Sequence, residues 1–97
     1  MMQQISRVTQ LDFEKDSEIL KALGHPIRLR MLCGLLLNND CNVNKIVEEM
    51  QLPQSTISQH LGILRNKGII KPVKDGVRTC YQVIDKRVID VIKLLKE

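Results

Sequence analysis

Apolar residues recur with helical spacing in the first third of the chain. The pattern from Leu11 to Leu23 predicts a first helix. Gly24 ends it, and Pro26 begins a second helix that runs to about Asn38. The second helix carries an apolar stripe at positions i, i+3, i+4, i+7 and i+8: Leu29, Leu32, Cys33, Leu36 and Leu37.

Two short helices around a tight turn follow. Asn42 is a suitable N-cap for a third helix over Val43–Met50, which ends at residues 51–53. A fourth helix runs over about residues 54–67, and Gly68 closes it where a left-handed backbone is needed. Helix, turn and helix in this order predict a helix-turn-helix.

The last third of the chain predicts a hairpin and a final helix. Residues 69–73 and 77–83 are rich in β-formers, and the pair Asp75-Gly76 predicts a two-residue turn between them. From Lys86 a helix begins that is apolar around more than half of its circumference, with Val88, Ile89, Val91, Ile92, Leu94 and Leu95. Such a helix needs two partners, its own domain and a second subunit.

These elements predict a mainly α fold with a small β-hairpin, a winged helix-turn-helix that dimerises through its first and last helices. We expect one domain over residues 1–97, with residues 1–9 disordered because they lack periodicity. A chain of 97 residues buries a smaller share of its surface than a longer one, so a second copy would stabilise it.

Composition narrows this picture. The chain is 43% hydrophobic but only 2% aromatic, so its core must be built from Leu, Ile, Val and Met. Fifteen Lys and Arg against eleven Asp and Glu give a net charge of +4, which suits a polyanionic partner but is shared by many soluble proteins. The N-terminus lacks a basic segment leading into an apolar run, and no apolar stretch approaches the roughly 18 residues that cross a bilayer. We therefore expect a cytoplasmic protein without a membrane partner.

The outward face of the fourth helix is small, polar and uncharged. At about 100° per residue, Ile57, Leu61 and Leu64 form one stripe. The opposite side holds Ser55, Gln59, Gly62 and Asn66. Surface helices usually carry Glu and Lys there, whereas a face that enters the DNA major groove favours short hydroxyl and amide groups. This face predicts DNA recognition.

The expected DNA contacts come from the first two turns of this helix and from basic residues beyond it. The first two turns hold Gln54, Ser55, Thr56, Ser58, Gln59 and His60, with Gln59 as the base reader. The basic set is Arg65, Lys67, Lys71, Lys74 and Arg78, the last three on the hairpin, where they reach the minor groove or the backbone. The alternative is that the hydroxyl groups only cap and solvate a surface helix.

Two motifs resemble the ArsR/SmtB family of winged-helix repressors. They are His25-Pro-x-Arg28-Leu29 and Leu52-Pro-Gln-Ser-Thr-Ile-Ser-Gln-His-Leu61, and the likeness extends from Leu20 to Leu95. The resemblance implies a homodimer on a partly palindromic DNA operator that leaves the DNA when an inducer binds. We expect the subunit interface at Leu11, Phe13, Leu20, Val88, Val91, Ile92 and Leu95.

The metal ligands of that family are replaced in this chain. Many members bind a metal through Cys-Val-Cys in the third helix, but Asn42 and Asn44 flank Val43 here, and Cys41 lies one position earlier. Others use Asp and His of the last helix, which has no His in this chain. No His/Cys pair has the spacing of a tetrahedral site. We therefore predict no metal site and no cofactor.

The three cysteines lack CxxC spacing and are expected to be thiols. Cys33 matches a position in a sulfur-sensing branch of the family, whose second cysteine is missing here. A thiol- or persulfide-responsive repressor that uses Cys33 is thus one alternative, with Cys80 of the hairpin as a candidate redox partner if the distance allows. The other reading of Cys33 is a small buried hydrophobic residue.

Two further function classes compete with DNA regulation. A winged helix can serve as a protein-interaction module, but protein interfaces concentrate aromatic residues, Met and Arg rather than the polar set found here. An enzyme is disfavoured because the sequence has no glycine-rich phosphate loop and no nucleophile with a base in a matching motif. The sequence therefore predicts a DNA-binding transcriptional regulator.

Overall fold

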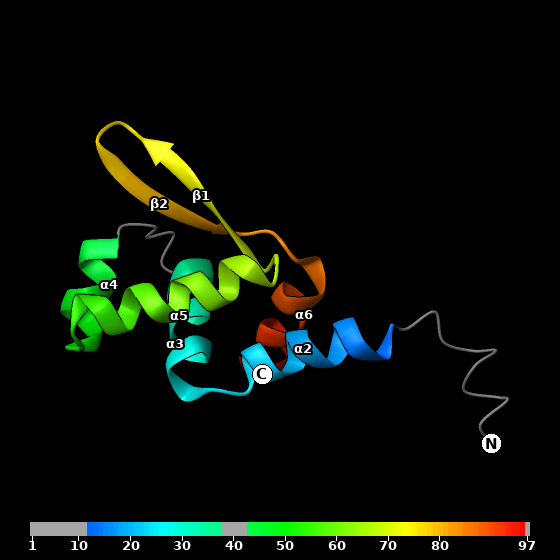
Figure 1. Cartoon of the computed structure of the whole chain (residues 1–97). Helices are drawn as coiled ribbons and strands as arrows, with labels where there is room; N and C mark the ends of the chain where they lie inside the picture. Colours follow the sequence, from blue (N-terminus) through cyan, green and yellow to red (C-terminus); the bar gives the residue numbers. More distant parts are fainter. Residues whose placement is uncertain (1–11, 38–42, 97) are drawn as a thin grey trace, which may run out of the picture.

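The computed structural model describes residues 12–37 and 43–96 (Figure 1). In chain order its elements are α2 (Phe13–Leu23), α3 (Pro26–Leu37), α4 (Val43–Met50), α5 (Gln54–Asn66), β1 (Ile70–Asp75), β2 (Arg78–Val83) and α6 (Lys86–Lys96). The prediction of a mainly helical fold with a two-stranded hairpin is confirmed. The predictions made for residues 1–9, Leu11, Cys41 and Asn42 lie outside the described residues.

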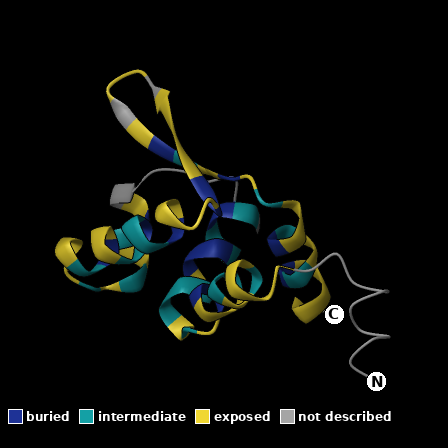
Figure 2. Ribbon diagram, turned by 45° about the vertical axis from the view of Figure 1, so that its right-hand side comes forward, coloured by how far each residue is buried: buried dark blue, intermediate teal, exposed yellow. Residues whose placement is uncertain are grey.

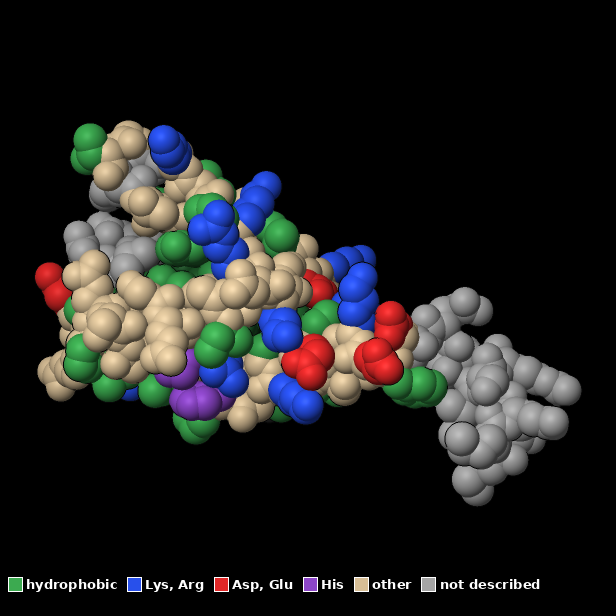
Figure 3. Space-filling view, viewed as in Figure 1, with side chains coloured by type: hydrophobic (Ala, Val, Ile, Leu, Met, Phe, Trp, Pro, Cys, Tyr) green, Lys and Arg blue, Asp and Glu red, His purple; other side chains and the backbone are tan. Residues whose placement is uncertain are grey.

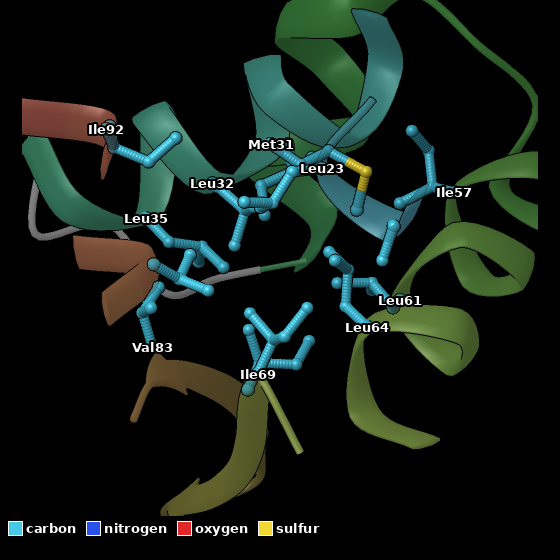
Figure 4. Close-up of a cluster of buried hydrophobic side chains, with 14 residues drawn as sticks. Leu23, Met31, Leu32, Leu35, Ile57, Leu61, Leu64, Ile69, Val83 and Ile92 are labelled. Atoms are coloured by element: carbon cyan, nitrogen blue, oxygen red, sulfur yellow. The ribbon is translucent and has the colours of Figure 1, made fainter. Parts of the chain in front are cut away.

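Helix α3 is the centre of the core, because it packs against α2, α5, α6 and β2. Its side chains Met31 and Leu32 are at most 1% exposed. Figure 4 shows them in one cluster with Leu64 of α5, Ile92 of α6 and Ile69, which precedes β1. The core is aliphatic with one Met, as the composition predicts, and each fully buried side chain of this kind contributes about 1.5–3 kcal/mol.

Helix α2 begins two residues later than its apolar pattern predicts. Asp12 is its N-cap, and its carboxylate accepts the backbone N–H of Lys15 at 3.2 Å. The backbone N–H of Asp12 donates in turn to the carboxylate of Asp16 at 3.2 Å. Because the cap satisfies N–H groups that have no intrahelical partner, it fixes the start of the helix.

The β1–β2 hairpin, called the wing below, projects from the helices and is exposed along most of its length (Figures 1 and 2). Its strands are antiparallel, with Ile70 opposite Val83 and Asp75 opposite Arg78. The two-residue loop is therefore Gly76-Val77, and the predicted turn at Asp75-Gly76 is wrong by one residue. Gly76 has φ 65°, and the first central position of a II′ turn needs such a positive φ.

The junction between α5 and the wing also needs a left-handed residue. Gly68 has φ 73°, which confirms its predicted role. Helix α5 ends at Asn66 with Lys67 as its C-cap, one residue earlier than predicted. Ile69 then donates its N–H to the carbonyl of Leu64 at 3.0 Å, so the chain turns directly from α5 into β1.

The two described cysteines differ in state. Cys80 in β2 is buried and disulfide-bonded, whereas Cys33 in α3 is free. The prediction that every cysteine is a thiol is therefore wrong for Cys80, and Cys33 does not pair with it. Spacing along the sequence does not report the Cα distances that decide which cysteines pair.

Candidate nucleic-acid interface

Helices α4 and α5 form the helix-turn-helix. Gln51 in the turn has φ 56°, and its N–H donates to the carbonyl of Val47 at 3.0 Å. Pro53 is the N-cap of α5, and its carbonyl accepts the N–H groups of Thr56 and Ile57 at 3.0 and 3.2 Å. Backbone hydrogen bonds thus end α4 and start α5.

Helix α5 has one buried and one exposed side. Ile57, Leu61 and Leu64 are at most 3% exposed and pack into the core. On the outer side Gln54, Ser55, Ser58, Gln59 and Asn66 are exposed, and Gly62 is partly exposed. Figure 3 shows this side as a tan surface along α5, which marks polar uncharged side chains and backbone. The helical geometry derived from the sequence places these residues as the structure does.

The N-terminus of α5 has no side-chain cap. Pro53 offers no side-chain acceptor, and no side-chain hydrogen bond closes this end of the helix. The first N–H groups of a helix have no intrahelical acceptor and carry a partial positive charge. This end therefore favours an anionic group such as a DNA phosphate.

Two of the predicted contact residues in the first turns of α5 are half-buried. Thr56 lies beside the exposed Ser55 but is partly covered. His60 faces inward to α3, where its ring centroid lies 4.7 Å from that of His25 and its Nδ1 lies 3.2 Å from Nη1 of Arg28. This contact joins residues 32 positions apart, and the helical period gives no sign of it.

The basic residues differ in whether their side chains are exposed to a DNA partner or are bound to another side chain of the chain. Arg65 in the last turn of α5 and Lys71 and Lys74 of β1 are exposed. Lys67 instead donates to the carboxylate of Glu18 at 3.0 Å, and this hydrogen bond is the main cause that lowers the pKa of Glu18. The side chain of Arg78 lies outside the described part of the structure.

A second surface lies between α2 and α6 and is apolar. Phe13 and Leu20 of α2 and Leu94 and Leu95 of α6 are each 61% to 68% exposed. Between the two helices lies an apolar groove of about 180 Å³. It is lined by Ile19, Leu20, Leu23, Val88 and Val91, with Asp16 and Arg87 at its border.

The predicted interface residues fall into two groups on this surface. Val88 and Ile92 are 1% exposed and belong to the chain's own core, whereas Phe13, Leu20 and Leu95 are open to a second molecule and Val91 is half-buried. Leu94, absent from the predicted set, is exposed beside them. Leu11 lies outside the described residues.

The described residues form neither a metal site nor a membrane-spanning helix. Among residues 12–37 and 43–96, no three His, Cys, Asp or Glu side chains come together as a metal site. Cys33 is half-buried and packs against the core cluster. None of the described helices has the length and apolarity that crossing a membrane requires.

Comparison with known proteins relates this chain to a family of bacterial regulators. The family model described as bacterial regulatory protein, arsR family, matches residues 25–71. An HTH-type transcriptional regulator of Methanocaldococcus jannaschii is 46% identical over 85 residues, which cover 88% of this chain and 96% of that protein. The transcriptional repressor PagR of Bacillus anthracis is 36% identical over 89 residues, covering 92% of this chain and 89% of PagR.

Solved structures agree with this result. The crystal structure of PagR superposes with a TM-score of 0.77 at 38% identity, over 86% of this chain and 94% of PagR. The structure of HlyU from Vibrio cholerae, a protein named a transcriptional activator, superposes with a TM-score of 0.79 at 32% identity, over 90% and 94% of the two chains. The relatives are regulators and not enzymes, as the sequence predicts. The chain is thus a transcriptional regulator of the ArsR/SmtB family, with a DNA-binding winged helix-turn-helix.

Proposed function

We propose that the chain is a homodimeric transcriptional repressor that binds a partly palindromic DNA operator through α5 and the wing. The observation that carries this proposal is the exposed, uncharged polar face of α5 beside the exposed lysines of the wing. The residues assigned to DNA contact are Gln54, Ser55, Thr56, Ser58, Gln59, Arg65, Lys67, Lys74 and Arg78. We propose that the protein performs this function without a metal or cofactor.

The chemistry of these residues suits them to different roles in DNA binding. An amide such as that of Gln59 can donate and accept toward one base edge, which provides sequence discrimination. The hydroxyl groups and the uncapped N-terminus of α5 suit phosphate oxygens, which fix the register of the protein on the duplex. Lys74 and Arg65 supply charge attraction that is independent of sequence and weakens with salt.

A second copy of the chain is the proposed occupant of the apolar α2–α6 surface. Four large apolar side chains are exposed on the two helices that line the apolar groove, and exposed apolar surface of this kind is typical of protein-interaction sites. A two-fold dimer would cover them and place two copies of α5 on one side of the assembly, which matches a partly palindromic operator. Dimerisation would also double the net charge of +4.

Repression is supported by the likeness to PagR, and activation is the alternative because HlyU is named an activator. A reporter driven by a promoter that contains the bound site distinguishes them. We expect expression of the chain to lower reporter output. An increase would assign activation, while leaving the DNA-binding proposal intact.

DNA binding is tested by selecting duplexes from a random-sequence library and measuring anisotropy at two salt concentrations. We expect the selected duplex to bind at least about a thousandfold more tightly than a scrambled duplex of equal composition, with an affinity that falls steeply with salt. Equal affinity for both duplexes, even at low salt, would refute sequence-specific binding. If apolar surface changes abolished activity and changes on α5 did not, the chain would be a protein-interaction module.

The dimer is tested with Leu20→Asp, which places a charge on the apolar α2–α6 surface. Sedimentation should show a dimer for the wild type and a monomer for the variant, since an unpaired carboxylate in an apolar interface is strongly unfavourable. Val77→Asp at the tip of the wing is the matched control, and it should remain dimeric. A dimeric Leu20→Asp variant would place the subunit interface elsewhere.

A further inference from the structure

A polar cluster joins α5 to α3 and to the end of α2, behind the side of α5 that we propose contacts DNA. Its members are His60 of α5, Arg28 of α3 and His25, which precedes α3. Figure 3 shows the only two histidines of the chain, in purple, side by side below α5 and next to a basic side chain in blue. All three residues are partly buried, in contrast to the exposed Ser58 and Gln59 that precede His60.

Arg28 is fixed at the end of α2. Its Nε donates to the carbonyl of Ala22 at 2.6 Å, and its Nη2 donates to the carbonyl of Lys21 at 3.4 Å. A cation at the C-terminal end of a helix also interacts favourably with the helix dipole. Two nitrogens of the planar guanidinium are thus occupied, and Nη1 remains directed at His60.

The contact between Arg28 and His60 requires a neutral His60. A guanidinium has only donors, so Nδ1 of His60 must accept, and the ring proton lies on Nε2. Nδ1 of His25 likewise accepts the backbone N–H of Ile27 at 3.1 Å. Burial, followed by the charges of His25 and Arg28, lowers the pKa of His60. A proton on Nδ1 would replace the acceptor by a donor facing a guanidinium nitrogen.

We propose that Arg28 and His60 are positioning residues that set the orientation of α5, and that protonation of His60 weakens operator binding. The apolar contacts of Ile57, Leu61 and Leu64 hold α5 against the core but have no direction. The Arg28–His60 hydrogen bond is directional and lies next to Gln59 in the helix. Recognition geometry depends on such supporting bonds because a shift of about 0.5 Å is enough to lose it.

This inference rests on the proposed function and gives His60 a role other than DNA contact. The two roles predict opposite pH effects. A His60 that touched phosphate would bind DNA more tightly when charged, whereas a positioning His60 loses its acceptor when charged. Because its folded-state pKa is lowered, the unfolded chain takes up the proton first as the pH falls through the ordinary His range of about 6.5, and stability declines there as well.

The test measures the affinity of full-length protein, at constant ionic strength, for the duplex selected at about pH 8 and for its scrambled counterpart, between about pH 8 and pH 5.5. We expect the ratio of the two affinities to fall about tenfold in the wild type as the pH is lowered, because the dimer loses one Arg28–His60 hydrogen bond in each subunit. A ratio that rises or stays constant in acid would overturn the positioning role. If no duplex is selected at all, the proposed DNA-binding function is refuted, and the positioning role of His60 is refuted together with it.

Two variants separate positioning from simple structural support. His60→Asn places an amide oxygen near the position of Nδ1 and does not titrate, so it should retain most of the wild-type ratio at about pH 8 and lose the pH dependence. His60→Leu keeps a bulky side chain without an acceptor and should show about a tenfold lower ratio at every pH. The proposal would be wrong if His60→Asn kept the full pH dependence. It would also be wrong if His60→Leu had the wild-type affinity ratio while its thermal unfolding curve showed that it is folded.

Discussion

Replacing Gln59 by alanine removes the amide that we assign to base recognition while leaving the core intact. Gln59 is exposed on α5, and the buried residues Ile57 and Leu61 lie on the other side of the helix. Alanine also favours the helix, so stability should not fall. The effect should therefore appear in DNA discrimination alone.

The magnitude follows from one base contact in each half-site. A bidentate side-chain contact provides about 1–3 kcal/mol of discrimination, so two of them in a dimer provide about 2–6 kcal/mol. The ratio of affinities for selected and scrambled duplex should fall at least about 30-fold in Gln59→Ala. Anisotropy titrations of both labelled duplexes at the same salt concentration measure this ratio.

Lys74→Ala gives the contrasting result. Lys74 lies on β1 opposite Thr79, close to the tip of the wing, and should contact phosphate. Its removal should weaken binding to both duplexes alike and reduce the salt slope by about 2 for a dimer. Lys93→Ala on α6 is the matched control and should change neither quantity. Equal loss of discrimination in Gln59→Ala and Lys74→Ala would refute the division into base and phosphate contacts.

Four further substitutions test the framework that presents these residues. Gly68→Ala should lower the free energy of unfolding, measured in urea, by about 1–2 kcal/mol, because Gly68 has φ 73°. Gly62→Ala should raise it by up to about 1 kcal/mol, because this position lies inside helix α5 with open space for a Cβ. The same sign for both substitutions would contradict the backbone argument. Leu64→Ala removes a side chain of 0% exposure and should cost about 2–5 kcal/mol, so a smaller loss would show that the underside of α5 can collapse. Glu18→Gln releases Lys67 from its ion pair and should raise the affinity for every duplex at low salt, as anisotropy would show; unchanged affinity would leave Lys67 outside the DNA contact surface.

The hydrophobic period predicted most of the fold because it reports local geometry. The stripe Ile57, Leu61 and Leu64 alone was enough to find the inner side of α5, and the structure buries all three. The same reasoning predicts the hairpin, but it places the turn one residue too early. Asp-Gly is a common turn pair, whereas here Gly76 occupies the first central position, and composition does not reveal which register the strands choose.

The sequence did not predict the contacts that cross the fold. Lys67 meets Glu18 at a separation of 49 residues, and Arg28 meets His60 at 32. A lysine in a basic stretch and a histidine in a polar turn both look like DNA contacts when their partners are unknown. The sequence does not predict the disulfide of Cys80 either, since pairing depends on distances that spacing does not report.

The claim that the outer face of α5 and the wing bind DNA is tested most directly by mapping backbone amide NMR shifts of the protein with the selected duplex. We predict the largest shifts in residues 54–59 and in Lys71, Val73 and Lys74, with small shifts on the α2–α6 surface around Leu20 and Leu95. Large shifts confined to the α2–α6 surface, with α5 unchanged, would contradict the account.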